Sequence, residues 1–205
     1  MSGSHPSETR AAGDASPRPN AEQLEHWGER AGPVWVRFQA QLDAQIAPHG
    51  ELALEALGPR PGERILDVGC GCGTTSLELA RRVGETGEVL GLDISPPMLA
   101  HARARAAQAG VAQVRFREAD AQTARLPEGH FDAVFSRFGV MFFEDPQAAF
   151  ANLCRALRPG GRLAFVCWQA PERNPWVALP MAAVAPLLAL PPPPPPEAPG
   201  MFSLA

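Results

Sequence analysis

The sequence predicts an α/β fold in which helices cover both faces of a doubly wound, mainly parallel β-sheet. Two observations support this prediction. From residue 64 onward, short apolar runs alternate with stretches of helical periodicity, and 45% of the 205 residues are hydrophobic, enough for a buried core. Alternating strands and helices form βαβ units with parallel strands. Right-handed crossovers between these units produce the doubly wound arrangement.

Two helices are expected before the first strand. One spans residues 34–46, where an apolar residue recurs at every fourth position. These apolar residues are Val34, Phe38, Leu42 and Ile46. A second, short helix is expected over residues 51–57, because Gly58 stands where a C-terminal capping glycine would stand. The predicted fold therefore begins with N-terminal helices.

The alternating part of the chain predicts strands and helices in turn. The strands are the apolar runs at residues 64–68, 89–92, 114–118, 131–136 and 163–168. The helices are residues 74–83, 97–109 and 146–157. Ser95 and Asp145 stand at N-cap positions and Gly110 at a C-cap position, which supports the helix ends. A turn at residues 158–161, Arg-Pro-Gly-Gly, is expected before the last strand.

Composition divides the chain into three parts. Residues 1–20 are polar and rich in Ser, Pro, Ala and Gly, which predicts a disordered tail. Residues 21–170 contain the periodic pattern and are expected to form the folded domain. Residues 171–205 include six consecutive prolines at 191–196, which favour an extended polyproline II conformation. This last part is expected to be a Pro-rich linker or a truncated C-terminal region.

Charge and cysteine content exclude several classes of protein. The net charge is −4, whereas proteins that clamp nucleic acids are usually basic, so no nucleic-acid partner is expected. No apolar run is long enough for a transmembrane segment, and residues 1–20 contain no secretory signal. The four cysteines are expected to be free thiols in a reducing compartment, the cytoplasm. Cys70 and Cys72 have no second ligand pair at zinc-site spacing, so no metal is expected.

The glycine-rich turn after the first predicted strand is the most informative motif. It reads Asp67-Val-Gly69-Cys-Gly71-Cys-Gly73. Glycines there let the backbone approach a ligand, and the following helix offers unpaired N–H groups. The dinucleotide fingerprint GxGxxG is not met, because Thr74 occupies the position of its third glycine. The carboxylate of Asp67 would repel a pyrophosphate but not an amino group.

Two further acidic residues follow predicted strands. Asp93 ends the second strand, where a carboxylate can accept hydrogen bonds from both hydroxyls of a ribose. Asp120 and Ala121 follow the third strand, where Asp120 can accept from the exocyclic amine of an adenine. The implied ligand has a ribose, an adenine and an amino-acid end but no phosphate.

In this order, the motifs resemble those of class I S-adenosylmethionine-dependent methyltransferases. The resemblance covers about residues 30–170 and includes Leu157-Arg-Pro-Gly-Gly161 before the last strand. Residues 131–143 are similar to small-molecule methyltransferases of the ubiquinone and menaquinone biosynthesis type. The resemblance implies a Rossmann-like sheet of seven strands, of which this sequence shows five. Strands six and seven are expected to be missing, which would leave residues 163–168 as an association-prone edge strand.

The resemblance also implies roles for the matching residues. The implied cofactor-binding residues are Asp67, Gly69, Gly71, Gly73, Asp93, Ile94, Asp120, Ala121 and Ser136. The substrate-side candidates are Arg137, Phe138 and Met141. Within this set, the glycines shape the loop around the methionine moiety, and Asp67 orients the loop and the amino group. Asp93 holds the ribose, and Ile94 and Ala121 enclose the adenine.

The activity implied by this resemblance is methyl transfer from S-adenosylmethionine to a carbon or oxygen nucleophile of a small molecule. Enzymes that methylate planar amines carry Asn or Asp followed by Pro-Pro-Tyr after strand four, whereas this chain has Ser136-Arg-Phe-Gly139. No catalytic base is identified. Two alternatives remain: a non-catalytic or truncated S-adenosylmethionine-binding domain, and an NAD-binding oxidoreductase. The missing GxGxxG motif and the presence of Asp67 disfavour the oxidoreductase.

Overall fold

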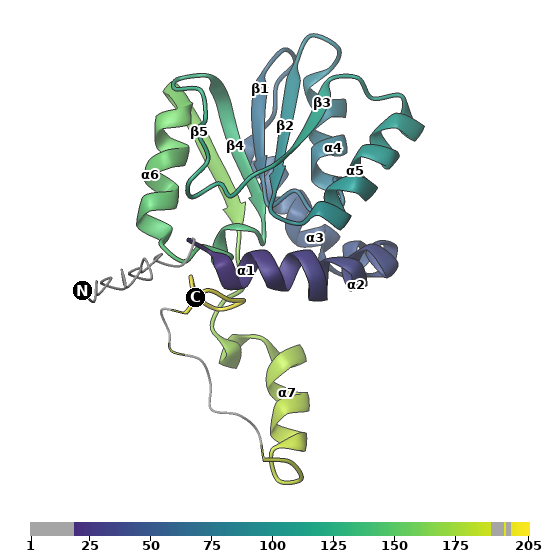
Figure 1. Ribbon diagram of the computed structural model, residues 1–205, viewed down its shortest axis with the longest axis vertical. Coiled ribbons are helices and arrows are strands. Elements are labelled where there is room, and N and C mark those ends of the chain that lie inside the picture. Colours follow the sequence, from purple (N-terminus) through teal and green to yellow (C-terminus); the bar gives the residue numbers. More distant parts are fainter. Residues whose placement is uncertain (1–18, 190–194, 196–197) are drawn as a thin grey trace, which may run out of the picture.

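The computed structural model describes residues 19–189, 195 and 198–205, and Figure 1 shows its sheet with helices on either side. The strands are β1 (Arg64–Val68), β2 (Glu88–Asp93), β3 (Val114–Glu118), β4 (Phe131–Arg137) and β5 (Leu157–Val166). All neighbouring strands are parallel, and their spatial order is β3-β2-β1-β4-β5. The predicted α/β, mainly parallel fold is confirmed.

Helices and short helical turns connect and flank the strands. The N-terminal elements are α1 (Ala21–Glu25), η1 (His26–Arg30), α2 (Ala31–Arg37) and α3 (Gln39–Leu57). The helices between strands are α4 (Thr74–Val83), α5 (Pro96–Ala109), η2 (Val140–Phe142) and α6 (Pro146–Ala156). The last elements are η3 (Pro171–Arg173) and α7 (Pro175–Val184).

Consecutive residues of a strand point to opposite faces of the sheet. Both faces are buried, because helices pack on each of them. Ile65 of β1 packs with α3, α4 and α5 in one apolar cluster. Its neighbour Leu66 packs with α6 and the loop after β3 in a second cluster on the other face. β1 pairs with both β2 and β4, so it lies in the centre of the sheet. The loops that follow these strands therefore meet at one edge.

The prediction of two separate N-terminal helices over 34–46 and 51–57 is wrong. Helix α2 ends at Arg37, and a single helix α3 continues to Leu57 with Pro48 inside it. Proline removes one helical hydrogen bond, but burial of Ala53, Leu54 and Leu57 against the sheet stabilises the continuous helix.

The predicted turn at residues 158–161 lies inside a strand. β5 already begins at Leu157, which pairs with Phe131, and the register shifts before Arg162 pairs with Ala133. Gly160 has a φ of +76° in this irregular stretch. At its other end β5 stops at Val166, so the predicted strand residues Cys167 and Trp168 leave the sheet.

The N-terminal tail predicted for residues 1–20 lies outside the described residues, except for Pro19 and Asn20. Asn20 is not part of a free tail, because it is buried. Its backbone N–H donates to the carboxylate of Glu144, and the backbone N–H of Glu144 donates to Asn20 Oδ1 at 2.8 Å. The proline run lies outside the described residues apart from Pro195.

Helix α7 lies apart from the sheet, whereas residues 198–205 contact η2, where the Gly200 N–H and Ser203 Oγ both donate to the carbonyl of Met141. Helix α7 projects away from the sheet in Figure 1, and none of its residues is buried. Among the described residues, five strands form the sheet, so β5 is its outer strand. No helix in the described ranges combines the length and apolar character needed to cross a bilayer.

Candidate functional site

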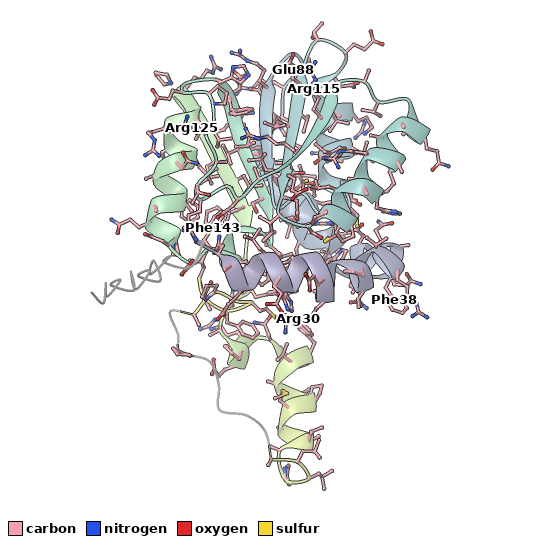
Figure 2. All side chains as sticks on the ribbon, in the orientation of Figure 1. Arg30, Phe38, Glu88, Arg115, Arg125 and Phe143 are labelled. Atoms are coloured by element: carbon pink, nitrogen blue, oxygen red, sulfur yellow. The ribbon has the colours of Figure 1, made fainter. Side chains whose placement is uncertain are left out.

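One cavity of about 810 Å³ lies at the edge of the sheet where the strands end. The loops after β1, β2, β3 and β4 form one part of its wall, and the N-terminal helices and the segment after β5 form the rest. Figure 2 shows Phe143, a lining residue, beside α1, whereas Glu88 and Arg115 lie at the opposite edge. The cavity therefore occupies the place where open parallel sheets usually bind ligands.

The glycine loop after β1 adopts a conformation that only glycine accepts without strain. Gly69, Gly71 and Gly73 have φ values of +67°, +53° and +79°. A Cβ on Gly69 would lie 2.7 Å from the Cα of Gly139 in the loop after β4. Gly69 and Gly71 line the cavity, whereas Gly73 lies behind them at the start of α4. The loop thus presents backbone atoms to the cavity.

Asp67 is fully buried beneath the loop and does not line the cavity. Its Oδ2 accepts hydrogen bonds from Thr75 Oγ1 at 2.7 Å and from Ser76 Oγ at 2.6 Å. Burial raises the pKa of Asp67 to about 6, although both hydroxyls oppose that shift. Oδ1 has no hydrogen-bond partner among the described residues. The structure thus gives Asp67 contacts that hold the loop against α4.

Asp93 lines the cavity at the end of β2. Its Oδ2 accepts from the backbone N–H of Gly71 at 2.7 Å, and its Oδ1 accepts from that of Ser95 at 2.9 Å. Burial raises the pKa of Asp93 above its usual value, against the lowering effect of these bonds. Each oxygen retains a lone pair for a further donor. Ile94 lines the cavity beside it.

The loop after β3 brings Asp120 and Ala121 to the same cavity. Asp120 Oδ1 accepts from the backbone N–H of Gln122 at 2.9 Å, which forms an Asx-type turn. Asn152 of α6 donates from Nδ2 to the carbonyls of Ala121 and Ala124 at 2.8 and 2.9 Å. Helix α6 therefore fixes a loop that the sequence identified only from its acidic residue.

Ser136 joins two loops and does not line the cavity. The buried Ser136 Oγ donates to the carbonyl of Val68 at 2.7 Å and accepts from the backbone N–H of Gly139 at 3.2 Å. The loop after β4 is thereby attached to the end of β1. Of the nine predicted cofactor-binding residues, Asp67, Gly73 and Ser136 lie behind the wall, and the remaining six line the cavity.

Arg137 forms a largely buried ion pair with Asp43 of α3. Thr74 Oγ1 donates to Asp43 at 2.6 Å, and Gln39 also donates to this carboxylate. Burial acts to raise the pKa of Asp43, but the bonds from Thr74, Arg137 and Gln39 outweigh it and lower the pKa. The sequence analysis missed Asp43. Only a weak feature of the sequence could have identified it: Asp43 is the only acidic residue between Glu29 and Glu51.

All four tryptophans of the chain line the cavity. Trp27 and Trp35 are 6.0 Å apart between ring centroids, and Trp27 lies 5.1 Å from Phe142. Trp168 and Trp176, 5.1 Å apart, come from the segment after β5. The sequence analysis identified none of the tryptophans, because neither their spacing nor their neighbours place them together.

A second aromatic group includes one of the substrate-side residues, Phe138, and its neighbours. We call His49, Phe138, Trp168 and Trp176 the aromatic end of the cavity. Phe138 stacks on Trp168 with centroids 4.4 Å apart and planes 16° apart. The predicted residues Arg137, Phe138 and Met141 all line the cavity. His49 of α3, which was not predicted, also lines the cavity, and its ring centroid lies 5.8 Å from that of Phe138.

The cysteines of the glycine loop are buried free thiols. Burial raises the pKa of Cys72 to about 12 and that of Cys70 well above its usual range. Both thiols therefore stay protonated near neutral pH, whereas a metal ligand must be a thiolate. In the described ranges, no group of three or more His, Cys, Asp or Glu side chains could hold a metal ion.

Residues 65–161 match a protein family described as a methyltransferase domain. The ubiquinone/menaquinone biosynthesis C-methyltransferase of Azotobacter vinelandii is 40% identical over 140 residues, which cover 68% of this chain and 50% of that protein. The nocamycin O-methyltransferase of Saccharothrix syringae is 40% identical over 116 residues, which cover 57% of this chain and 41% of that protein. The chain thus spans about half the length of the curated relatives that it matches.

A solved structure gives the same answer for the fold. The crystal structure of an S-adenosylmethionine-dependent methyltransferase from Aquifex aeolicus aligns with a TM-score of 0.55 and 28% identity. The alignment covers 58% of this chain and 64% of that chain. The family match includes β1 to β4, and with them the loops that form one part of the cavity wall.

Proposed function

Because this chain has the methyltransferase domain and the fold of the class I S-adenosylmethionine-dependent methyltransferases, we propose that it methylates a carbon or oxygen nucleophile of a small molecule. One observation carries the proposal. A single cavity joins the glycine loop, Asp93 and the loop of Asp120 to an end lined by aromatic side chains. Such a cavity can hold a polar cofactor and a mainly apolar acceptor side by side.

The residues of the cavity fit S-adenosylmethionine. Its volume of about 810 Å³ leaves room for a nucleoside and a second small ligand. In our proposal Asp93 accepts from the ribose hydroxyls, and Ile94 and Ala121 enclose the adenine. The backbone of Gly69 and Gly71 faces the methionine moiety. When bound, the cofactor supplies an electrophilic methyl group whose leaving group is neutral, so no general acid is required.

Two residues behind the wall, and one ion pair that lines the cavity, have a positioning role in this proposal. Asp67 holds the glycine loop on α4, and Ser136 holds the loop after β4 on β1. Asp43 neutralises Arg137 at the border of the two parts of the cavity. An unpaired guanidinium there would repel the positively charged sulfonium, so the ion pair favours cofactor binding.

The domain boundary in our proposal extends beyond residue 170. Residues 21–170 contain the cofactor loops, and the following segment contributes Asn174 and Trp176 to the cavity wall. We therefore assign residues 173–176 and Met201 to the acceptor side rather than to a simple linker. A small-molecule acceptor, no nucleic-acid partner and a cytoplasmic location complete the proposal. The net charge of −4 and the four free cysteines support it.

Calorimetry with three ligands tests the assignment of the cofactor. S-adenosylmethionine and S-adenosylhomocysteine are expected to bind, and NAD is not. Binding of NAD without any response to S-adenosylhomocysteine would overturn the proposal in favour of an oxidoreductase. A second measurement follows labelled methyl from S-adenosylmethionine into the small molecules of a cell extract. Cofactor binding without labelling of any quinol, phenol or related acceptor would favour a non-catalytic binding domain.

A further inference from the structure

The first helical elements of the domain lie across the edge of the sheet at which the strands end (Figure 1). We call residues 20–37, which comprise Asn20 and the elements α1, η1 and α2, the N-terminal strap. Trp27 and Trp35 of the strap line the cavity. Only two strap residues, Asn20 and Gly32, are buried. A segment with so few buried contacts belongs to the least stable part of a fold and can open while the rest of the domain stays folded.

The first buried strap residue attaches the strap to the loop between η2 and α6. The backbone N–H of Glu144 donates to Asn20 Oδ1 at 2.8 Å, and the backbone N–H of Asn20 donates to the carboxylate of Glu144. Phe142 of the neighbouring η2 lies 5.1 Å from Trp27 between ring centroids. One end of the strap is therefore held by the segment that follows β4.

The second attachment uses Ser95, which follows β2. A serine at the N-cap of a helix normally accepts a hydrogen bond from the first helical turn. Ser95 stands at the N-cap of α5, but its side chain makes no capping hydrogen bond. Its fully buried Oγ instead donates to the carbonyl of Trp27 at 2.7 Å. The backbone N–H of Ser95 donates to Asp93 Oδ1 at 2.9 Å. One residue thus connects the strap to the carboxylate that we propose holds the ribose.

Gly32, the second buried strap residue, allows this attachment because it has no side chain. A Cβ on Gly32 would lie 2.1 Å from the carbonyl oxygen of Trp27 and 2.4 Å from Ser95 Oγ. Trp27 belongs to η1, a π-helical turn, and such turns are rare and frequently occur at functional sites. In the same turn, a Cβ on Gly28 would have Pro96 Cδ as its nearest neighbour at 4.0 Å, an ordinary contact. Of these two glycines, only Gly32 is required by the close approach of the strap to Ser95.

We propose that the strap is a gate over the cofactor site and that Ser95 is the positioning residue that holds it closed. The inference rests on the proposed methyltransferase function, because it takes Asp93 as the residue that binds the ribose. The cofactor enters and leaves only while the strap is open, so both of its rates are limited by how often the strap opens. A ribose bound to Asp93 fixes the carboxylate that also accepts from Ser95, and it thereby favours the closed strap.

Stopped-flow tryptophan fluorescence tests the gate with S-adenosylhomocysteine as the probe, because all four tryptophans line the cavity. Ser95→Ala removes one hydrogen bond from the closed strap and is expected to raise both the association and the dissociation rate constant about fivefold. Gly32→Ala is expected to raise both at least as much, because the new Cβ separates the strap from Ser95. Gly28→Ala, in the same turn, is the matched control and is expected to change neither rate constant.

The direction of the change in association distinguishes a gate from a purely structural contact. A distorted binding site releases the probe faster but does not bind it faster, whereas a gate that opens more often does both. Faster dissociation with unchanged or slower association in Ser95→Ala would therefore overturn the proposal. Unchanged values of both rate constants would overturn it as well.

Limited digestion with trypsin detects the opening of the strap directly. The chain contains arginine but no lysine, so trypsin cleaves it only after arginines. Arg30 lies in the strap, whereas Arg81 of α4 lies outside the cavity wall and reports on opening of the domain. S-adenosylhomocysteine is expected to slow cleavage after Arg30, relative to cleavage after Arg81, about fivefold in wild type and less than about twofold in Ser95→Ala. Equal protection of the two sites in wild type would show that the strap does not open separately and would overturn the gate.

The same samples separate this inference from the function on which it rests. A wild-type chain that does not bind S-adenosylhomocysteine contradicts the proposed function itself. A wild-type chain that binds it, together with variants whose rate constants equal those of wild type, contradicts only the gate. The double variant Ser95→Ala with Gly32→Ala is expected to have the rate constants of Gly32→Ala alone, because both substitutions break one contact. Additive effects would overturn the role of Ser95. If Gly32→Ala fails to fold, Ser95→Ala and the digestion still decide the outcome.

Discussion

The two parts of the cavity are built in opposite ways. The cofactor part consists of loops that each follow a strand directly, and it presents backbone atoms and carboxylates. The acceptor part consists of bulky side chains from the N-terminal helices, from the loop after β4 and from the segment after β5. The cofactor part is therefore determined by short stretches of sequence, whereas the acceptor part depends on contacts between distant segments. One fold can thereby keep its cofactor while its acceptor changes.

The two parts also differ in how firmly the domain holds them. Gly69 packs against the loop after β4, and the buried Asp67 of β1 accepts hydrogen bonds from α4. Trp176 of α7 is 54% exposed, and α7 has no buried residue. Substitutions of the buried residues that hold the glycine loop should therefore affect stability and cofactor affinity together. Those in the acceptor part should affect acceptor binding alone.

The largest effect is expected for Gly69→Ala. The new Cβ would lie 2.7 Å from the backbone of Gly139 at a φ of +67°, so S-adenosylhomocysteine binding should be lost. Gly84→Ala is the matched control, because Gly84 has a φ of +69° with no atom within 4 Å. It should lower the unfolding free energy by only about 1 kcal/mol. Calorimetry measures S-adenosylhomocysteine affinity and denaturant unfolding measures stability for both variants. Equal effects of the two substitutions would show that the contact of Gly69 with the backbone of Gly139 is unimportant.

Asp43→Ala tests the border between the two parts. Removing one partner of a buried ion pair typically destabilises a protein by about 3–5 kcal/mol, because the other charge remains buried. The double variant Asp43→Ala with Arg137→Met should recover part of this loss. Denaturant unfolding gives the free energies, and Asp132→Ala removes a carboxylate at the opposite edge as a control. If the double variant is no more stable than Asp43→Ala, the two residues do not act as a pair.

Asp93→Ala should separate cofactor affinity from folding. Loss of the proposed charge-assisted hydrogen bonds to the ribose should weaken the binding of S-adenosylhomocysteine by about 2–4 kcal/mol. The fold should persist, because Asp93 stands at the end of β2 and is only partly buried. Glu88→Ala, an exposed position at the start of β2, serves as the control. Unchanged affinity in Asp93→Ala would show that the ribose is held by other residues.

The buried carboxyl of Asp67 should make stability depend on pH. Its pKa is raised from 3.8 to about 6, so between these values the folded state binds more protons than the unfolded state. The stabilising contribution of the neutral carboxyl is complete below pH 3.8 and is lost as the pH rises through 6. The unfolding free energy of wild type, relative to Asp67→Asn, should fall by roughly 2–3 kcal/mol from pH 4 to 7. A difference that stays constant or increases with pH would contradict this.

The smallest effect on stability is expected for Trp176→Ala in the acceptor part. Because Trp176 is half exposed and α7 has no buried residue, the unfolding free energy should change by less than about 1 kcal/mol. S-adenosylhomocysteine should bind as tightly as to wild type, whereas transfer of labelled methyl to the small molecules of a cell extract should decrease. A parallel loss of cofactor affinity would break the distinction between the two parts of the cavity.

The fold was largely predictable because each strand is a short apolar run with a distinctive end. β1 and β3 have the predicted bounds, and β2 and β4 differ by one residue at their ends. Prediction failed where tertiary contacts overrode local signals. Two helices were expected over residues 34–46 and 51–57, but α3 runs without interruption from Gln39 to Leu57. Within it, Gly50 allows the side chain of Arg137 to cross over the helix, because a Cβ there would lie 2.8 Å from Arg137 Cδ. Packing of α3 then preserves the helix through the proline.

The candidate site was predictable only in its cofactor part. Asp93, Asp120 and the glycines follow strands, so their positions in the sequence place them at the same edge. Asp43, His49 and the tryptophans lack such a rule, because their position follows from how distant segments pack. Sequence position also did not distinguish residues in the wall from those behind it. Asp67 and Ser136 stabilise the loops, whereas the residues next to them in the sequence line the cavity.

The contact between Gly69 and Gly139 has a thermodynamic consequence. These glycines meet backbone to backbone, so neither loop can be displaced without moving the other. Phe138 precedes Gly139, and its ring is part of the aromatic end. A ligand that orders the glycine loop therefore also orders the wall that faces the acceptor. Coupling of this kind is reciprocal, so we expect the cofactor and the proposed acceptor each to raise the affinity of the other by the same factor.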